Sequence, residues 1–243
     1  MSDTSNSAKR VYALLREAKR ANSNVLVRGV WAAVFEIDAE NIPLIYARLV
    51  RLDQELGDTE KQIQSFESDC SLYLRHFSTL HGVVSPKNLD AHWGPTQDTL
   101  SEQALESLEF CSSVLDKKAP EKQLPDDDLD ILRNQIREIV DLIANSSLPN
   151  SAKQILADIA RSLQDALHEY RIRGVRGLRE ELYAVFARLE RNMPAIAPEK
   201  DDSVVGRIFE YLKLWQVTTS AYLNTSQLAG SILPALLERV AGS

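Results

Sequence analysis

IYARLVRLDQELGDTEKQIQSFESDCSLYLRHFSTL, residues 45–80, is the stretch that decides the fold. Apolar and small residues recur along it at alternating steps of four and three, which is the spacing of a heptad repeat. Charged residues flank the stripe and suit a solvated margin. The pattern predicts a long heptad-patterned helix or a helical hairpin. Gly57 and Asp58 are a candidate place for a bend or a split, and Ser68 and Asp69 could cap a fresh helix. The stripe consists of Ile45, Leu49, Leu52, Leu56, Thr59, Ile63, Phe66, Cys70, Tyr73, Phe77 and Leu80.

Helical patterns also dominate the rest of the chain. The apolar run VLVRGVWAAVFEI at 25–37 has no strand-like segment to pair with, so we interpret it as a helix. Thr99 and Glu102 have the spacing of a capping box that starts a helix ending near Asp116. The sequence therefore predicts an all-α fold, a helical bundle. A further inward stripe comprises Leu129, Leu132, Ile136, Ile139 and Ile143.

Two polar stretches separate helical parts of the chain. Residues 82–98, GVVSPKNLDAHWGPTQD, contain two glycines and two prolines and are typical of a loop. The stretch DKKAPEKQLPDDD is the best candidate for a domain boundary. It separates an N-terminal helical region, 1–118, from a C-terminal one, 125–243. The alternative is one continuous helical domain.

The segment EYRIRGVRGLRE, residues 169–180, combines four arginines with two glycines. It follows no strand and lacks a Gly-Lys-Ser/Thr ending, which argues against a phosphate-binding loop. Apolar residues keep helical spacing through Gly174, so we favour a long, continuous or kinked helix over 152–191, with a break at Gly174 as the alternative. The periodic residues are Leu163, Leu167, Tyr170, Gly174, Leu178, Leu182, Val185 and Leu189.

Five residues are candidates for binding a partner protein. Arg173, Arg176 and Arg179 step by three along one side of the expected helix and suit an acidic protein surface, an RNA backbone or intramolecular carboxylates. Trp215 and Tyr222 lie in or beside helical sequence within the uncharged stretch 214–237. That stretch is interpreted as core, with a docking surface or membrane contact as alternatives. A last helix is expected to begin at Ser226 and to bend at Pro234.

Groups suited to catalysis or metal binding are few. His76, His81 and His92, with Cys70 and Asp90, lack the spacing of a metal site, and no cofactor is indicated. The acidic run at 126–130 suits a helix start better than a cation site. Asp90 and His92 could form an acid–base pair, which is the basis of an enzyme hypothesis. We expect no catalytic residue and no metal ligand.

Composition limits the partners. The 243-residue chain carries a net charge of -7, which argues against generic binding to nucleic acid or anionic membranes. Its two cysteines are too few for a disulfide framework. Because the polar N-terminus lacks a signal-peptide pattern, we expect a cytoplasmic protein.

Segments 88–93 (NLDAHW), 105–111 (LESLEFC) and 169–180 resemble uncharacterised bacterial all-helical proteins. The resemblance covers parts of residues 88–190 and implies a bacterial accessory protein. It supplies no site residue.

The function expected from the sequence is a non-enzymatic helical module for protein–protein interaction. A regulator, an antitoxin-like inhibitor or an accessory subunit of a co-encoded bacterial protein fits this description, and so does a homo-oligomer. No small-molecule ligand is indicated. The alternatives are a hydrolase-like enzyme with a site in the 82–98 loop, and a nucleic-acid-binding regulator. The last is suggested by the three arginines together with the basic N-terminal residues Lys9, Arg10, Arg16, Lys19, Arg20 and Arg28.

Overall fold

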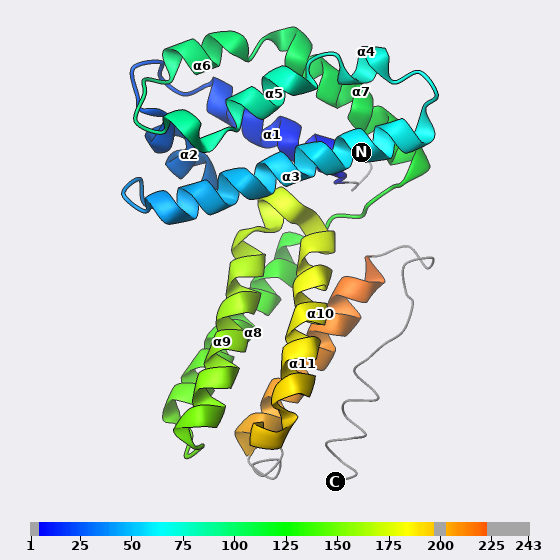
Figure 1. Ribbon diagram of the computed structural model, residues 1–243. Coiled ribbons are helices and arrows are strands. Elements are labelled where there is room, and N and C mark those ends of the chain that lie inside the picture. The colour runs from blue at the N-terminus through cyan, green and yellow to red at the C-terminus, as the bar shows by residue number, and fades with distance from the viewer. Residues whose placement is uncertain (1–4, 197–202, 223–243) are drawn as a thin grey trace. The chain divides into compact units, whose positions relative to one another are not determined.

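The computed structural model describes residues 5–196 and 203–222. In these residues the regular structure is helical, as the sequence predicts (Figure 1). A single antiparallel bridge joins Leu26 to His92. The chain divides into two compact units. The first contains residues up to Glu121 and the segment Arg171–Gly174, and the second contains 122–170 and the chain from Val175 onward.

The first unit is built around α1, which packs against α2, α3 and α7. Its capping residue explains where α1 begins. The Asn6 side chain accepts a hydrogen bond from the amide of Lys9 and donates to Ser112 and Asp116 of α7. The helices of this unit are α1 (Ser7–Lys19), α2 (Val27–Phe35), α3 (Ile42–Phe66), α4 (Ser71–Leu74), α5 (Phe77–Val83), the 3-10 turn η1 (Pro86–Asn88), α6 (Gly94–Thr99) and α7 (Glu102–Lys118).

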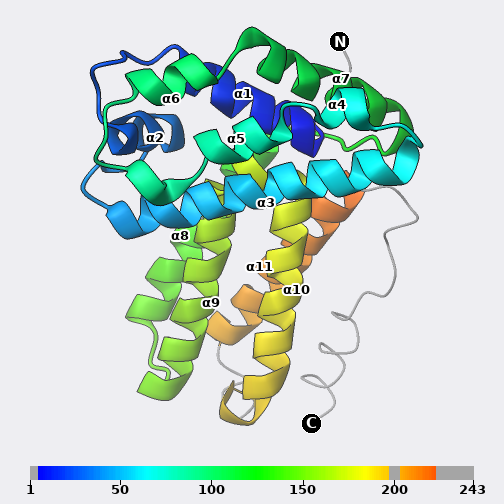
Figure 2. The same cartoon turned by 45° about the horizontal axis from the view of Figure 1, so that its top comes forward.

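The heptad stripe predicted over 45–80 is buried in its first part and again at Phe77 and Leu80, but not in between. Stripe residues from Ile45 to Ile63 are buried along α3, which runs straight through Gly57. The helix ends at Phe66, whose side chain is 37% exposed, and the chain then turns into the short helices α4 and α5. Figure 2 shows α5 lying along α3. Apolar spacing alone did not reveal this interruption, because it resumes in α5, but the capping signal at Ser68 and Asp69 lies at the start of α4.

The segment 82–98, predicted as a loop, contains α6 and η1 and is fastened to the chain before α2. The amide of Trp93 donates to the carbonyl of Val25 at 2.8 Å. The buried Trp93 ring meets Trp31 of α2 edge to face, with ring centroids 6.0 Å apart. α7 then begins one residue after Ser101, whose hydroxyl accepts from the amide of Ala104. The predicted capping residue Thr99 was therefore wrong.

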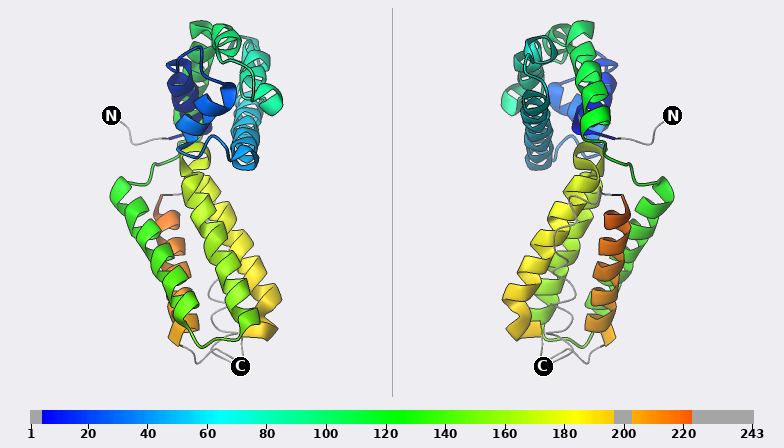
Figure 3. Two further views of the ribbon diagram at one scale, coloured as in Figure 1. Left: turned by 90° about the vertical axis from the view of Figure 1, so that its left-hand side faces the viewer. Right: turned by 90° about the vertical axis from the view of Figure 1, so that its right-hand side faces the viewer.

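Among the described residues of the second unit, four helical segments have apolar stripes that form one core. α8 packs against both α9 and α11, and α8 and α11 lie side by side in Figure 3. The five residues of the stripe predicted between Leu129 and Ile143 are all buried. Tyr211 and Tyr222 donate hydrogen bonds to Glu138 and Asp128 of α8. The elements are α8 (Asp126–Asn145), α9 (Asn150–His168), α10 (Tyr170–Ile196, of which this unit contains the part from Val175) and α11 (Ser203–Ala221).

The long, continuous or kinked helix favoured over 152–191 is not confirmed. α9 ends at His168, and Gly174 has φ 61° and ψ -158°, far from helical values. Glycine alone adopts this conformation readily. A Cβ atom at Gly174 would lie 2.5 Å from Nη1 of Arg10 and 2.6 Å from Oε1 of Glu121. The helix therefore breaks here. Because Gly174 has no Cβ atom, the side chains of Arg10 and Glu121 can lie close to its backbone.

Arg171 holds the short segment Arg171–Gly174 in the first unit, although the chain before and after this segment belongs to the second. Its guanidinium donates to the carbonyl of Val34 at the end of α2 and pairs with Glu17 of α1 at 2.6 Å and with Glu36 at 2.8 Å. Glu36 itself has a left-handed backbone, with φ 57°, where α2 ends. These contacts tie the segment to two helices.

Arg10 is the buried centre of the same region. Its guanidinium donates to the carbonyls of Ile172, at 2.9 Å, and of Ser5. It also pairs with Glu55 of α3 at 2.9 Å and Glu121 at 2.8 Å. The side chains of Arg10 and Glu55 are only 5% and 4% exposed. A charge buried to this degree requires such partners.

The predictions for the C-terminal end of the chain fall only partly within the described residues. Ser226, Pro234 and the part of 214–237 after Tyr222 lie outside the described residues. Within the described ranges, none of the helices has the length and apolar character needed to cross a bilayer.

Candidate partner-binding groove

The five predicted partner-binding residues differ in their surroundings. Arg173, Arg176 and Arg179 are half-buried, and each has an interaction of its own. The break at Gly174 interrupts the helical step that was expected to align the three. Trp215 is completely buried in the core of the second unit, so its ring is not on the surface. Tyr222 is half-buried and bonded to α8, and a partner-binding role for the five stays a prediction.

The residues behind the enzyme hypothesis do not pair with each other. Asp90 forms an ion pair with Arg28 at 3.0 Å. Nδ1 of the exposed His92 lies 3.0 Å from the carbonyl oxygen of Asn24, to which it donates a hydrogen bond. Each side chain thus fixes the loop to the chain before α2.

The candidate metal ligands are also dispersed. His81 of α5 contacts two carboxylates of α3, with Nδ1 2.5 Å from Asp53 and Nε2 3.4 Å from Glu60. These contacts join the two helices. Over the described part of the chain, His, Cys, Asp and Glu form no cluster suited to a metal ion.

The basic residues near the N-terminus are largely engaged in ion pairs within the chain. Arg16 and Lys19 both pair with Glu102, and Arg28 pairs with Glu40 as well as with Asp90. Binding to phosphates relies on cations that exchange small counterions rather than fixed carboxylates. This pairing weakens the nucleic-acid hypothesis.

A groove of about 410 Å³ lies between α4 and α7. Two large apolar side chains line it from opposite sides, Leu72 of α4, 73% exposed, and Phe110 of α7, 61% exposed. Large exposed apolar side chains gathered in one concave site are typical of protein interaction sites. The remaining lining residues are Tyr73, Arg75, His76, Gln103, Glu106 and Ser107.

Local sequence explains how both walls are held. Asp69 accepts hydrogen bonds from the amide and hydroxyl of Ser71, which lowers the pKa of its carboxyl and supports the first turn of α4. Burial raises the pKa of Cys111 to about 12, so its thiol keeps the proton that it donates to the carbonyl of Tyr73, 3.8 Å away. This weak bond joins α7 to α4 beneath the groove.

Two opposite charges face the groove without ion pairs. Arg75 contributes from the end of α4 and Glu106 from α7, and neither forms an ion pair with any described residue. Surface charges that are not neutralised within a chain are available to fix the register of a bound partner. The groove thus combines an apolar floor with a basic side and an acidic side.

A wider groove, of about 650 Å³, lies between α1 and α7, but most of its polar groups are engaged within the chain. Glu17 pairs with Arg171, and Arg16 pairs with Glu102. The hydroxyl of Tyr12 donates a hydrogen bond to Glu109, which raises the pKa of the phenol. The α4/α7 groove is therefore the better candidate for an unfilled binding site.

Sequence reasoning missed both apolar residues of the α4/α7 groove. Phe110 falls off the inward stripe formed by Leu105, Leu108 and Cys111, and an aromatic residue on the outer face of a helix was a usable signal. Leu72 was overlooked because the heptad pattern assigned the neighbouring Tyr73 to the seam. Comparison of the chain with protein-family models, with curated proteins and with solved structures gave no match in any of the three.

Proposed function

We propose that this protein is a non-enzymatic helical interaction module that binds another protein through the α4/α7 groove. The observation that carries the proposal is the joint exposure of Leu72 and Phe110 in one concave site. Burying two such side chains on association would contribute on the order of 1.5–3 kcal/mol each before the costs of binding. The accompanying unpaired charges of Arg75 and Glu106 would orient the partner.

The occupant that suits the groove is an amphipathic helix of a different protein. A helix presents apolar residues one turn apart to a hydrophobic groove, and its flanking residues face the rims. We expect an acidic residue of the partner to face Arg75 and a basic residue to face Glu106. A second copy of this chain suits it less well, because two facing concave sites would not fill each other.

In this proposal the protein acts as a regulator, an antitoxin-like inhibitor or an accessory subunit of a co-encoded bacterial protein in the cytoplasm. Each of these roles requires a stable contact with a partner and no chemistry of its own. The groove lies within the first unit, where the buried ion pair of Arg10 and Glu55 joins α1 to α3.

Replacing Phe110 with aspartate is expected to abolish partner binding. The substitution places a charge on the apolar floor while changing an exposed side chain, so the fold should keep its melting temperature. The measurement is affinity purification of the full chain from cells that naturally produce it, followed by titration of the recovered partner against purified wild type and variant. We expect affinity to fall at least tenfold.

The matched control is Ile131→Asp, which changes an apolar residue of α8 that is 50% exposed and does not line the groove. This variant should bind the partner like wild type. Recovery of the chain alone at native abundance would contradict the proposal. Equal loss of binding in both variants would also contradict it.

A further inference from the structure

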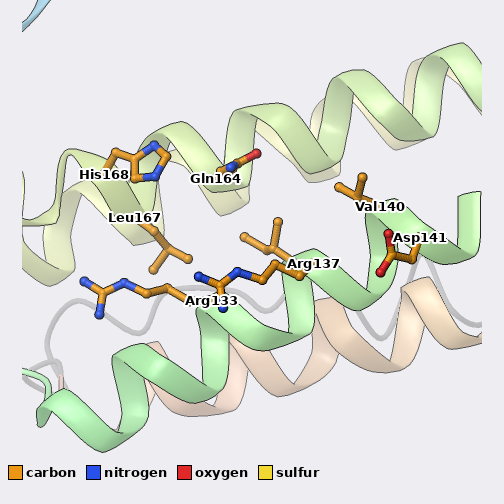
Figure 4. Close-up of a pocket in the computed structure, with 8 residues that line it drawn as sticks. Arg133, Arg137, Val140, Asp141, Gln164, Leu167 and His168 are labelled. Carbon is orange, nitrogen blue, oxygen red and sulfur yellow. The ribbon is translucent and has the colours of Figure 1, made fainter. Parts of the chain in front are cut away.

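A second pocket, of about 390 Å³, lies in the second unit between α8 and α9. Figure 4 shows the long side chains of Arg133 and Arg137 reaching from α8 along the side of the pocket, with Gln164 and His168 on α9 across from them. Ile136, Val140 and Leu167 supply apolar lining. The site therefore places donors beside an apolar floor.

The two arginines are one turn apart on the same helix. Like charges at this spacing repel each other and destabilise a helix slightly. The charge of Arg133 is balanced by an ion pair in which its Nη1 lies 2.8 Å from Oδ1 of Asp130. Arg137 is bonded only to the neutral amide oxygen of Asn134, at 3.1 Å, and has no carboxylate partner among the residues that the structure describes. Arg137 therefore brings to the pocket a guanidinium that has no ion pair of its own, while the carboxylate of Asp141 also lines the pocket.

We propose that this pocket binds the phosphate group of a small organic phosphate. Two guanidinium groups can share the oxygens of one phosphate, and charge-assisted hydrogen bonds of this kind are stronger than neutral ones. The Gln164 amide and the His168 ring add donors from α9. Ile136, Val140 and Leu167 offer contact surface to the organic part of the ligand.

Two features limit what the pocket accepts. His168 is the last residue of α9, and the negative end of the helix dipole disfavours an anion there. The carboxylate of Asp141 lies at the end of the pocket away from His168, where it repels a second anionic group (Figure 4). The favoured ligand therefore carries a single phosphate, held by the arginines, on an uncharged body.

Calorimetric titration of the full chain with phenyl phosphate tests the proposal. Wild type should show saturable binding of one ligand, and Arg137→Gln should weaken it about tenfold or more, because a charge-assisted contact is lost. Arg161→Gln is the matched control, since Arg161 is an exposed α9 arginine that pairs with Asp158 and does not line the pocket. It should bind like wild type.

Benzoate in the same titration distinguishes phosphate recognition from general attraction of anions. We expect it to bind more weakly than phenyl phosphate, because it carries less charge and fewer acceptor oxygens. No saturable binding of phenyl phosphate to wild type would overturn the proposal. Equal weakening by Arg137→Gln and Arg161→Gln, or equal affinity for benzoate, would do the same. Partner binding at the α4/α7 groove is independent of all these outcomes.

Discussion

Replacing Gly174 with alanine is expected to lower the free energy of unfolding by about 2–4 kcal/mol. The backbone at this residue has φ 61° and ψ -158°, a region that residues with a side chain avoid at a cost of about 1–3 kcal/mol. The new Cβ would also lie 2.5 Å from the guanidinium of Arg10 and 2.6 Å from Glu121, so both must shift. Leucine should be at least as destabilising. Denaturant unfolding of both variants measures the effect.

Gly57→Ala is the control for this prediction. Gly57 lies inside α3, and a Cβ atom there would meet nothing within 4 Å. Alanine should therefore stabilise the chain by about 0.5–1 kcal/mol through its better helix propensity. If Gly174→Ala unfolds at the same denaturant concentration as wild type, the break in the backbone is not a feature of the protein in solution.

Replacing Arg10 with methionine is expected to destabilise the chain by about 3–5 kcal/mol, the range seen when one partner of a buried ion pair is removed. Glu55 would keep a buried charge without its partner, and the carbonyl of Ile172 would lose its donor. Thermal and denaturant unfolding measure the loss.

Two comparison variants separate this effect from a general loss of charge. Arg16→Met removes an exposed arginine of the same helix that pairs with Glu102, and it should leave the melting temperature within experimental error. The double variant Arg10→Met with Glu55→Met should be more stable than Arg10→Met alone, because it no longer buries a Glu55 carboxylate that has lost the Arg10 guanidinium. Equal stability of Arg10→Met and wild type would show that the buried network contributes nothing.

The sequence predicted which residues are buried better than it predicted where the helices break. The stripe from Leu129 to Ile143 became the buried face of α8, and the apolar run after Val25 became α2, because both depend on local spacing. Gly174 could not be assigned in the same way. A glycine fits a helical stripe and a left-handed break equally well, and its contacts with Arg10 involve residues far away in sequence.

The candidate sites show the same limit. Arg10 was grouped with the basic N-terminal residues that suggested binding to nucleic acid. Its partners Glu55 and Ile172 are 45 and 162 positions away, so no local pattern reveals its burial. Trp215 was a candidate for partner binding within a stretch interpreted as core, and its ring is buried in the core. Phe110 was detectable as an aromatic residue off the inward stripe, but its pairing with Leu72 required the three-dimensional arrangement of α4 and α7.

Photo-crosslinking from position 72 tests the central claim most directly. A photo-reactive amino acid replaces Leu72 in the full chain, in cells that naturally produce the protein, and the same residue at position 131 serves as control. We predict that position 72 gives an adduct with one different protein, joined through an amphipathic helix with an acidic residue beside the crosslink. The adduct should be absent from position 131 and lost when Phe110→Asp is added. An adduct only with another copy of this chain, the same adduct from both positions, or none at all would contradict the account.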